Sequence, residues 1–215
     1  MNLRQVIGFT AAVLLGAVLL TPAQASAQAT TVGVKGGWNS SNIDLDFPDE
    51  TVVPTDSFNG LIIGGLVGRD LNAKVGILAE FLYARTGTKV DATDLIRNVT
   101  VDYIQIPILG RANFKASNAA VVHVFGGPMF AFKTSQSETV TLDGVDVPVD
   151  EADEASLKGN DVGITIGAGF TINRFLVDVR YTWGLMNLND ASGVGEPEVK
   201  SRQFAVMFGM ELWRK

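Results

Sequence analysis

The chain of 215 residues contains no cysteine and one histidine, His123. Without cysteine it has no disulfide, no thiolate nucleophile and no cysteine metal site. Beyond residue 27 no apolar run approaches the about 20 residues that a membrane helix needs. Basic residues are also scarce, 17 against 23 acidic ones, and this balance argues against nucleic acid as a partner.

The N-terminus has the layout of a secretory signal. Residues 1–4 are short and basic, residues 6–20 are apolar, and the small residues Ala25 and Ala27 form an A-x-A site. An apolar run of about 15 residues is short for a retained membrane helix, which is the alternative. We therefore expect a cleaved signal peptide over 1–27 and one domain over 28–215, with 23 acidic residues against 16 basic ones.

Strand-like alternation fills the rest of the chain, and no segment keeps a helical period. Short connections at 72–74, 115–119 and 173–174 take turns with longer polar ones around 44–57, 91–98, 138–158 and 189–200. This order predicts an all-β, antiparallel up-and-down meander with its tight turns at one end. The expected strands are 30–43, 58–71, 75–90, 99–114, 120–137, 159–172, 175–188 and 201–213.

The stretch NDVGITIGAGFTIN, residues 160–173, shows the alternation most clearly. Every second position is Asp, Gly or Thr, and the positions between them are apolar, so the two kinds fall on opposite faces of a strand. The other strands divide in the same way, except that 58–71 is apolar on both phases. Glycine weakens a water-facing strand without gain, but it leaves room for long side chains inside a narrow barrel.

We therefore predict an eight-stranded transmembrane β-barrel whose apolar face meets lipid and whose polar face lines the lumen. The alternative is a periplasmic lipocalin-like barrel that carries an apolar ligand inside. The polar residues expected in the lumen are Lys35, Glu80, Arg111, His123, Lys133, Asp178, Arg180 and Glu211. The aromatics expected to form one interfacial girdle are Trp38, Tyr83, Phe132, Tyr181, Trp183 and Phe204.

Several strings, taken in order, resemble the PorT-like outer-membrane β-barrel domain family. VGVKGGWNSSNI at 32–43 is similar to its G-x-K-x-G-x-N-x-S-N first strand. LAEFLYARTG, DYIQIPIL, GGPMFAF, DVGITIGAG and VDVRYTWGLMNL follow along the chain. The resemblance implies an eight-stranded outer-membrane barrel that the barrel-insertion machinery places in lipid. Such barrels usually end on an aromatic residue, whereas Trp213 is followed here by Arg214 and Lys215.

Catalysis, ion conduction and cation binding are three functions that these residues could have, and each has a structural alternative. A Ser–His–Asp hydrolase would need a serine and a carboxylate beside His123, and the serines cluster far from it, so we predict no catalytic residues. The luminal charges of mixed sign fit a plug of paired side chains better than an ion path. The acidic stretches at 44–50 and 149–155 lack EF-hand spacing, so we expect a solvated surface rather than a Ca²⁺ site, with a weak divalent-cation bridge to lipopolysaccharide as the alternative.

The sequence thus predicts a non-enzymatic outer-membrane barrel without cofactor or metal. Its role is expected to be structural or to lie in acidic external loops that contact an unidentified partner.

Overall fold

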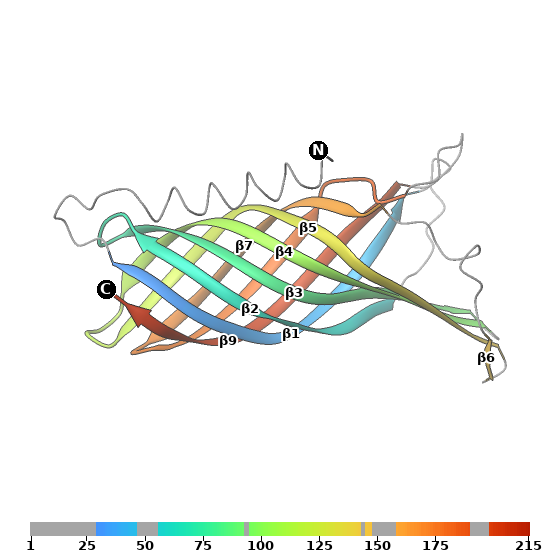
Figure 1. Ribbon diagram of the computed structural model, residues 1–215, viewed down its shortest axis with the longest axis horizontal. Coiled ribbons are helices and arrows are strands. Elements are labelled where there is room, and N and C mark those ends of the chain that lie inside the picture. The colour runs from blue at the N-terminus through green and yellow to red at the C-terminus, as the bar shows by residue number, and fades with distance from the viewer. Residues whose placement is uncertain (1–28, 47–55, 93–94, 143–144, 148–157, 190–197) are drawn as a thin grey trace.

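The computed structural model describes residues 29–46, 56–92, 95–142, 145–147, 158–189 and 198–215. These residues are all-β, and eight long strands wind around a common axis (Figure 1). The strands are β1 (Thr30–Asp46), β2 (Asp56–Asp70), β3 (Val75–Ala92), β4 (Leu95–Lys115), β5 (Ala120–Leu142), β6 (Val145–Val147), β7 (Asn160–Ile172), β8 (Phe175–Gly184) and β9 (Glu198–Arg214).

The eight long strands form a closed hydrogen-bonded ring. The strands pair antiparallel in the order β4, β3, β2, β1, β9, β8, β7, β5, and pairing of β4 with β5 closes the ring. The short β6 pairs only with the end of β5 and stands outside the ring. Closure leaves no sheet edge facing lipid, where an unpaired backbone group would cost several kcal/mol. The predicted fold class is confirmed.

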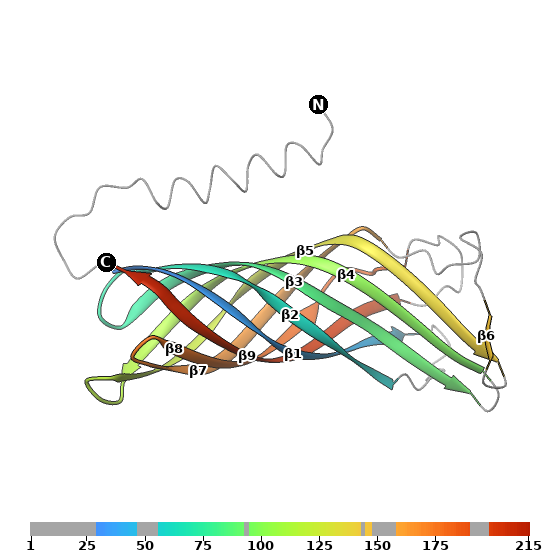
Figure 2. The ribbon, with the colours of Figure 1, turned by 60° about the horizontal axis from the view of Figure 1, so that its bottom comes forward.

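The three tight turns lie at one end, here called the turn end (Figure 2). Between β2 and β3 the side chain of Asn72 accepts hydrogen bonds from the backbone N–H groups of Lys74 and Val75, at 2.8 and 2.9 Å. Between β7 and β8 a two-residue turn places Asn173 at a φ of 54°, a left-handed conformation that asparagine tolerates. In both of these turns an asparagine therefore supplies what the turn geometry requires.

The opposite, loop end differs from the prediction: β1, β2, β3, β4, β5 and β9 are longer there than expected, and β8 ends at Gly184 instead of 188. Residues 91–98 and 138–158 were expected to be polar loops, but β3 runs to Ala92, β4 starts at Leu95 and β5 continues to Leu142. Cross-strand partners explain the extension: Arg97 forms an ion pair with Glu138, so polar residues here stay in register instead of leaving the sheet. We call residues 85–92, 95–102, 134–142 and 145–147 the outer arm (Figures 1 and 2).

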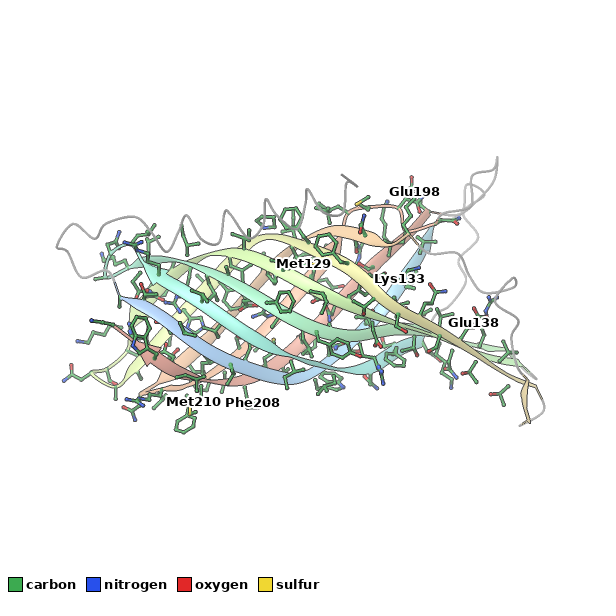
Figure 3. All side chains as sticks on the ribbon, viewed as in Figure 1. Met129, Lys133, Glu138, Glu198, Phe208 and Met210 are labelled. Atoms are coloured by element: carbon green, nitrogen blue, oxygen red, sulfur yellow. The ribbon has the colours of Figure 1, made fainter. Side chains whose placement is uncertain are left out.

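Apolar side chains cover the outside of the barrel, and Figure 3 shows Phe208 and Met210 projecting away from β9. Phe81 is 59% exposed, Phe208 61% and Ile166 49%, whereas Glu80, Thr165 and Met207 beside them in the sequence are buried. In the segment that was ambiguous, Leu61 and Ile63 face out. Across the described ranges no helix is long and apolar enough to cross a membrane.

This orientation predicts that two adjacent residues of β7 differ in how well they tolerate substitution. Replacing the outward-facing Ile166 by Arg should destabilise the barrel in vesicles by about 2–4 kcal/mol, because a charge then faces the bilayer midplane. Thr165→Ser should cost little, because serine keeps a hydroxyl to share with Thr182, 2.8 Å away. Urea unfolding in lipid vesicles measures both, and equal losses would contradict the orientation.

Candidate functional site

Four charged side chains meet in the middle of the lumen, on strands that alternate polar residues inward. Lys35 comes from β1, Glu80 from β3, and both Asp178 and Arg180 from β8. The last two lie two residues apart on one strand and therefore face the same side. The side chains are at most 4% exposed.

The four groups form a closed ring of ion pairs, which we call the charge ring. Lys35 Nζ lies 2.6 Å from Glu80 Oε1 and 2.7 Å from Asp178 Oδ2. Arg180 donates from Nη1 to Glu80 Oε2 at 2.5 Å and from Nη2 to Oε1 at 3.1 Å. Its Nε donates to Asp178 Oδ1, also at 3.1 Å. Each cation contacts both anions, so the ring is neutral and each charge is paired.

Glycines leave the space that the charge ring occupies. A Cβ on Gly209 would lie 2.8 Å from the Cβ of Lys35, and one on Gly169 would lie 2.8 Å from the Cβ of Asp178. A Cβ on Gly167 would collide with the ring of Phe125, over which the guanidinium of Arg180 sits at 5.1 Å from the centroid. The glycines of the polar phase are therefore required by close approach inside a narrow lumen.

Apolar layers close the lumen on both sides of the charge ring. Along β3, Leu78 precedes Glu80 on the turn side and Leu82 follows it on the loop side. The turn-side layer consists of Leu66, Leu78, Leu109, Phe125 and Leu176. The loop-side layer consists of Ile62, Leu82, Ala84, Ala205 and Met207. A further cluster on β4 and β5 consists of Val99, Val101, Tyr103, Met129 and Ala131.

These inward apolar residues were missed in the sequence, where the inward phase was described as glycine and polar groups. The sequence does indicate such residues at 58–71. This segment is apolar on both phases because Ile62 and Leu66 face the lumen while their neighbours face lipid.

The remaining luminal residues of the prediction do not join the charge ring. Arg111, His123 and Glu211 line a cavity at the turn end. Arg111 pairs with a residue that was not among those predicted for the lumen: its Nη2 lies 2.8 Å from Oδ1 of Asp70, the last residue of β2. Lys133 lies near the loop end and its Nζ donates to Gln136 Oε1 at 3.0 Å (Figure 3).

Four of the aromatics predicted for the girdle lie on the adjacent strands β1, β9 and β8, and the other two lie on β3 and β5, on either side of β4. Trp38 packs edge-on against Phe204 with ring centroids 6.2 Å apart, and Tyr181 and Trp183 are 4.6 Å apart. Tyr83 and Phe132 both pair in register with Ile104. A second group near the turn end was not predicted: Phe114, Phe175 and Trp213 are exposed. Phe114 and Phe175 lie on the apolar phase of their strands. Trp213 shares the phase of Glu211, and a register shift between β1 and β9 at this point turns it outward.

The surroundings of His123 do not form a catalytic triad. Ser117 lines the same cavity, but its hydroxyl accepts hydrogen bonds from the backbone N–H groups of Ala119 and Ala120, at 3.2 and 3.1 Å. The ring of His123 packs against Phe125 instead, with centroids 6.0 Å apart. Within the described part of the chain no three His, Asp or Glu side chains cluster as metal ligands would.

The charge ring predicts that removing a buried charge costs far more stability than removing an exposed one. Glu80→Gln leaves Lys35 and Arg180 sharing only Asp178, and breaking such a buried network should cost about 3–5 kcal/mol. Glu198→Gln, which removes an exposed partner of Lys200, should leave stability unchanged. Urea unfolding in vesicles gives both values, and a stable Glu80→Gln barrel would show that the ring contributes little.

Several solved structures are similar to this chain. They include Ail, the attachment invasion locus protein of Yersinia pestis, at 13% identity and a TM-score of 0.41, covering 87% of this chain and 99% of that one. Neisserial surface protein A matches at 11% identity and a TM-score of 0.46, covering 86% and 99%. The outer membrane protein OprG from Pseudomonas aeruginosa matches at 13% identity and a TM-score of 0.47, covering 88% and 98%.

Comparison with curated protein sequences finds no match. One family model matches residues 23–190, which is most of the chain and includes the strands that carry the charge ring up to Arg180. Its description, outer membrane protein beta-barrel domain, agrees with the closed ring of strands and the apolar exterior. The chain therefore belongs to the outer membrane protein beta-barrel domain family.

Proposed function

We propose that this outer-membrane barrel is a non-conducting, non-enzymatic protein whose role is structural or lies in contacts made at its loop end. One observation carries the proposal: the neutral charge ring, enclosed by apolar layers on both sides, occupies the middle of the lumen. An ion on its way through would have to separate buried ion pairs and enter apolar surroundings. Porins that leave an aqueous channel have about 16 strands or more.

Beside His123 the described residues include no arranged nucleophile, and this supports the non-enzymatic part of the proposal. The hydroxyl of Ser117 is engaged by backbone N–H groups, and the charged groups of the ring are saturated by one another. Groups held in this way are not free to attack or protonate a substrate.

The outer arm supports a role in contacts at the loop end. Thr134, Ser135, Ser137 and Thr139 of β5 are exposed there and present hydroxyl groups. Arg85 donates to Asp102 across two strands at 2.9 Å, and this hydrogen bond lowers the pKa of the Asp102 carboxyl below its ordinary value. A partner would therefore meet a polar surface with paired charges.

Three further parts of the proposal rest on the sequence: the signal peptide, the acidic loops and the place in the PorT-like family. The signal peptide over 1–27 and most of the acidic stretches at 44–50 and 149–155 lie outside the described residues. The ordered strings that resemble the PorT-like family support a place in that branch, and insertion machinery and outer-membrane lipid are the partners this implies. A periplasmic lipocalin-like carrier is disfavoured, because the apolar face is the outer one.

Fractionation of cells that express the full chain tests where the barrel resides. We expect it in the outer-membrane fraction, with a gel mobility that changes on boiling because a closed barrel resists detergent until heated. A soluble periplasmic protein of unchanged mobility would favour the lipocalin-like carrier.

Planar-bilayer recording tests whether the lumen is closed. The purified barrel should give no discrete current steps, whereas a porin of about 16 strands reconstituted in the same way conducts. Stable steps that persist in Glu198→Gln but change in Asp178→Asn would place an ion path through the charge ring and overturn the proposal.

A further inference from the structure

A polar cavity of about 220 Å³ lies at the turn end of the lumen. Its wall includes residues of the tight turns, such as Asn72 and Ser117, and luminal residues of β4, β5, β7 and β9. Phe125 of the turn-side apolar layer contacts His123 of this cavity, so the layer separates the cavity from the loop end. The space is large enough for several water molecules or for a small ion.

Positive charge exceeds negative charge around the cavity. Three cations, Arg111, Lys115 and Arg214, line it against two carboxylates, Asp70 and Glu211. Both oxygens of Asp70 are already engaged, Oδ1 by Arg111 Nη2 at 2.8 Å and Oδ2 by Arg214 Nη2 at 3.1 Å. Glu211 lies 3.6 Å from Arg214. Both carboxylates thus pair with arginines, and the residues that line the cavity carry one net positive charge.

One donor of the cavity wall lacks an acceptor within the described part of the protein. The side chain of Arg111 is only 12% exposed, and its Nε is buried without a hydrogen-bond partner. A buried donor without an acceptor is costly, which makes an acceptor from outside the chain favourable. His123 lines the same cavity and is 6% exposed, and Lys115 stands exposed at the end of β4.

We propose that this cavity binds the phosphate group of a small periplasmic molecule. Guanidinium and ammonium donors suit phosphate oxygens, and Arg111 can keep its contact with Asp70 through Nη2 while the rest of its guanidinium turns toward the ligand. The turns that border the cavity face the periplasm in barrels of this topology. The site is separate from the charge ring, so it needs no passage through the lumen.

Titration of the purified full chain with inorganic phosphate tests the proposal, in a maltoside detergent that carries no phosphate. Calorimetry should show saturable binding, and Arg111→Gln should weaken it by about tenfold or more, because a hydrogen bond to a charged group is lost. Lys115→Gln should weaken binding by a smaller factor. Lys74→Gln, which removes an exposed cation of the neighbouring turn outside the cavity wall, is the matched control and should bind as the parent does.

Boiling-sensitive gel mobility shows whether each variant is folded. If Arg111→Gln does not fold, the comparison of Lys115→Gln with Lys74→Gln decides. No saturable binding, or equal weakening by the control, would overturn the proposal and leave a water-filled cavity. Binding seen only when anionic phospholipid is added, and not with free phosphate, would overturn the assignment to a small molecule and give the site to a lipid headgroup.

Discussion

The ion pairs across the lumen are the constraint on which the rest of the barrel depends. Lys35, Glu80, Asp178 and Arg180 join β1, β3 and β8, strands that are not neighbours in the ring. A buried charge is tolerated only when its partners are in place, so these strands must keep their relative heights. The inward glycines and the position of Phe125 follow from the room that these four side chains need.

The interior around the charge ring is packed like the core of a soluble protein. Layers such as that of Leu78 and Leu109 on the turn side and that of Leu82 and Met207 on the loop side exclude water from the ion pairs. Apolar residues therefore lie on both faces of the barrel wall: some face lipid, and others form a water-free interior. This explains why β2 is apolar on both phases, and why Leu78 and Leu82 flank Glu80 on the inward phase of β3.

The fold could be predicted from the sequence because alternation is a local property: each strand shows its two faces without reference to its partners. The ends of strands could not be predicted in this way. The outer arm exists because Arg97 and Glu138 meet across two strands, and an extra residue, Thr134, shifts the register of β5 there. The polar phase of the strands supplied the list of luminal residues, but their grouping could not be predicted, because which luminal charges meet depends on strand register. Asp70 was missed for the same reason.

The neutrality of the charge ring has an electrical consequence. The outer membrane can carry a potential when charged polymers are unequally distributed across it, and a potential does work only on charge that moves. Two cations locked to two anions carry no net charge along the barrel axis, so a potential has nothing to displace. A membrane potential therefore exerts no net force on the charge ring, although it lies in the middle of the barrel.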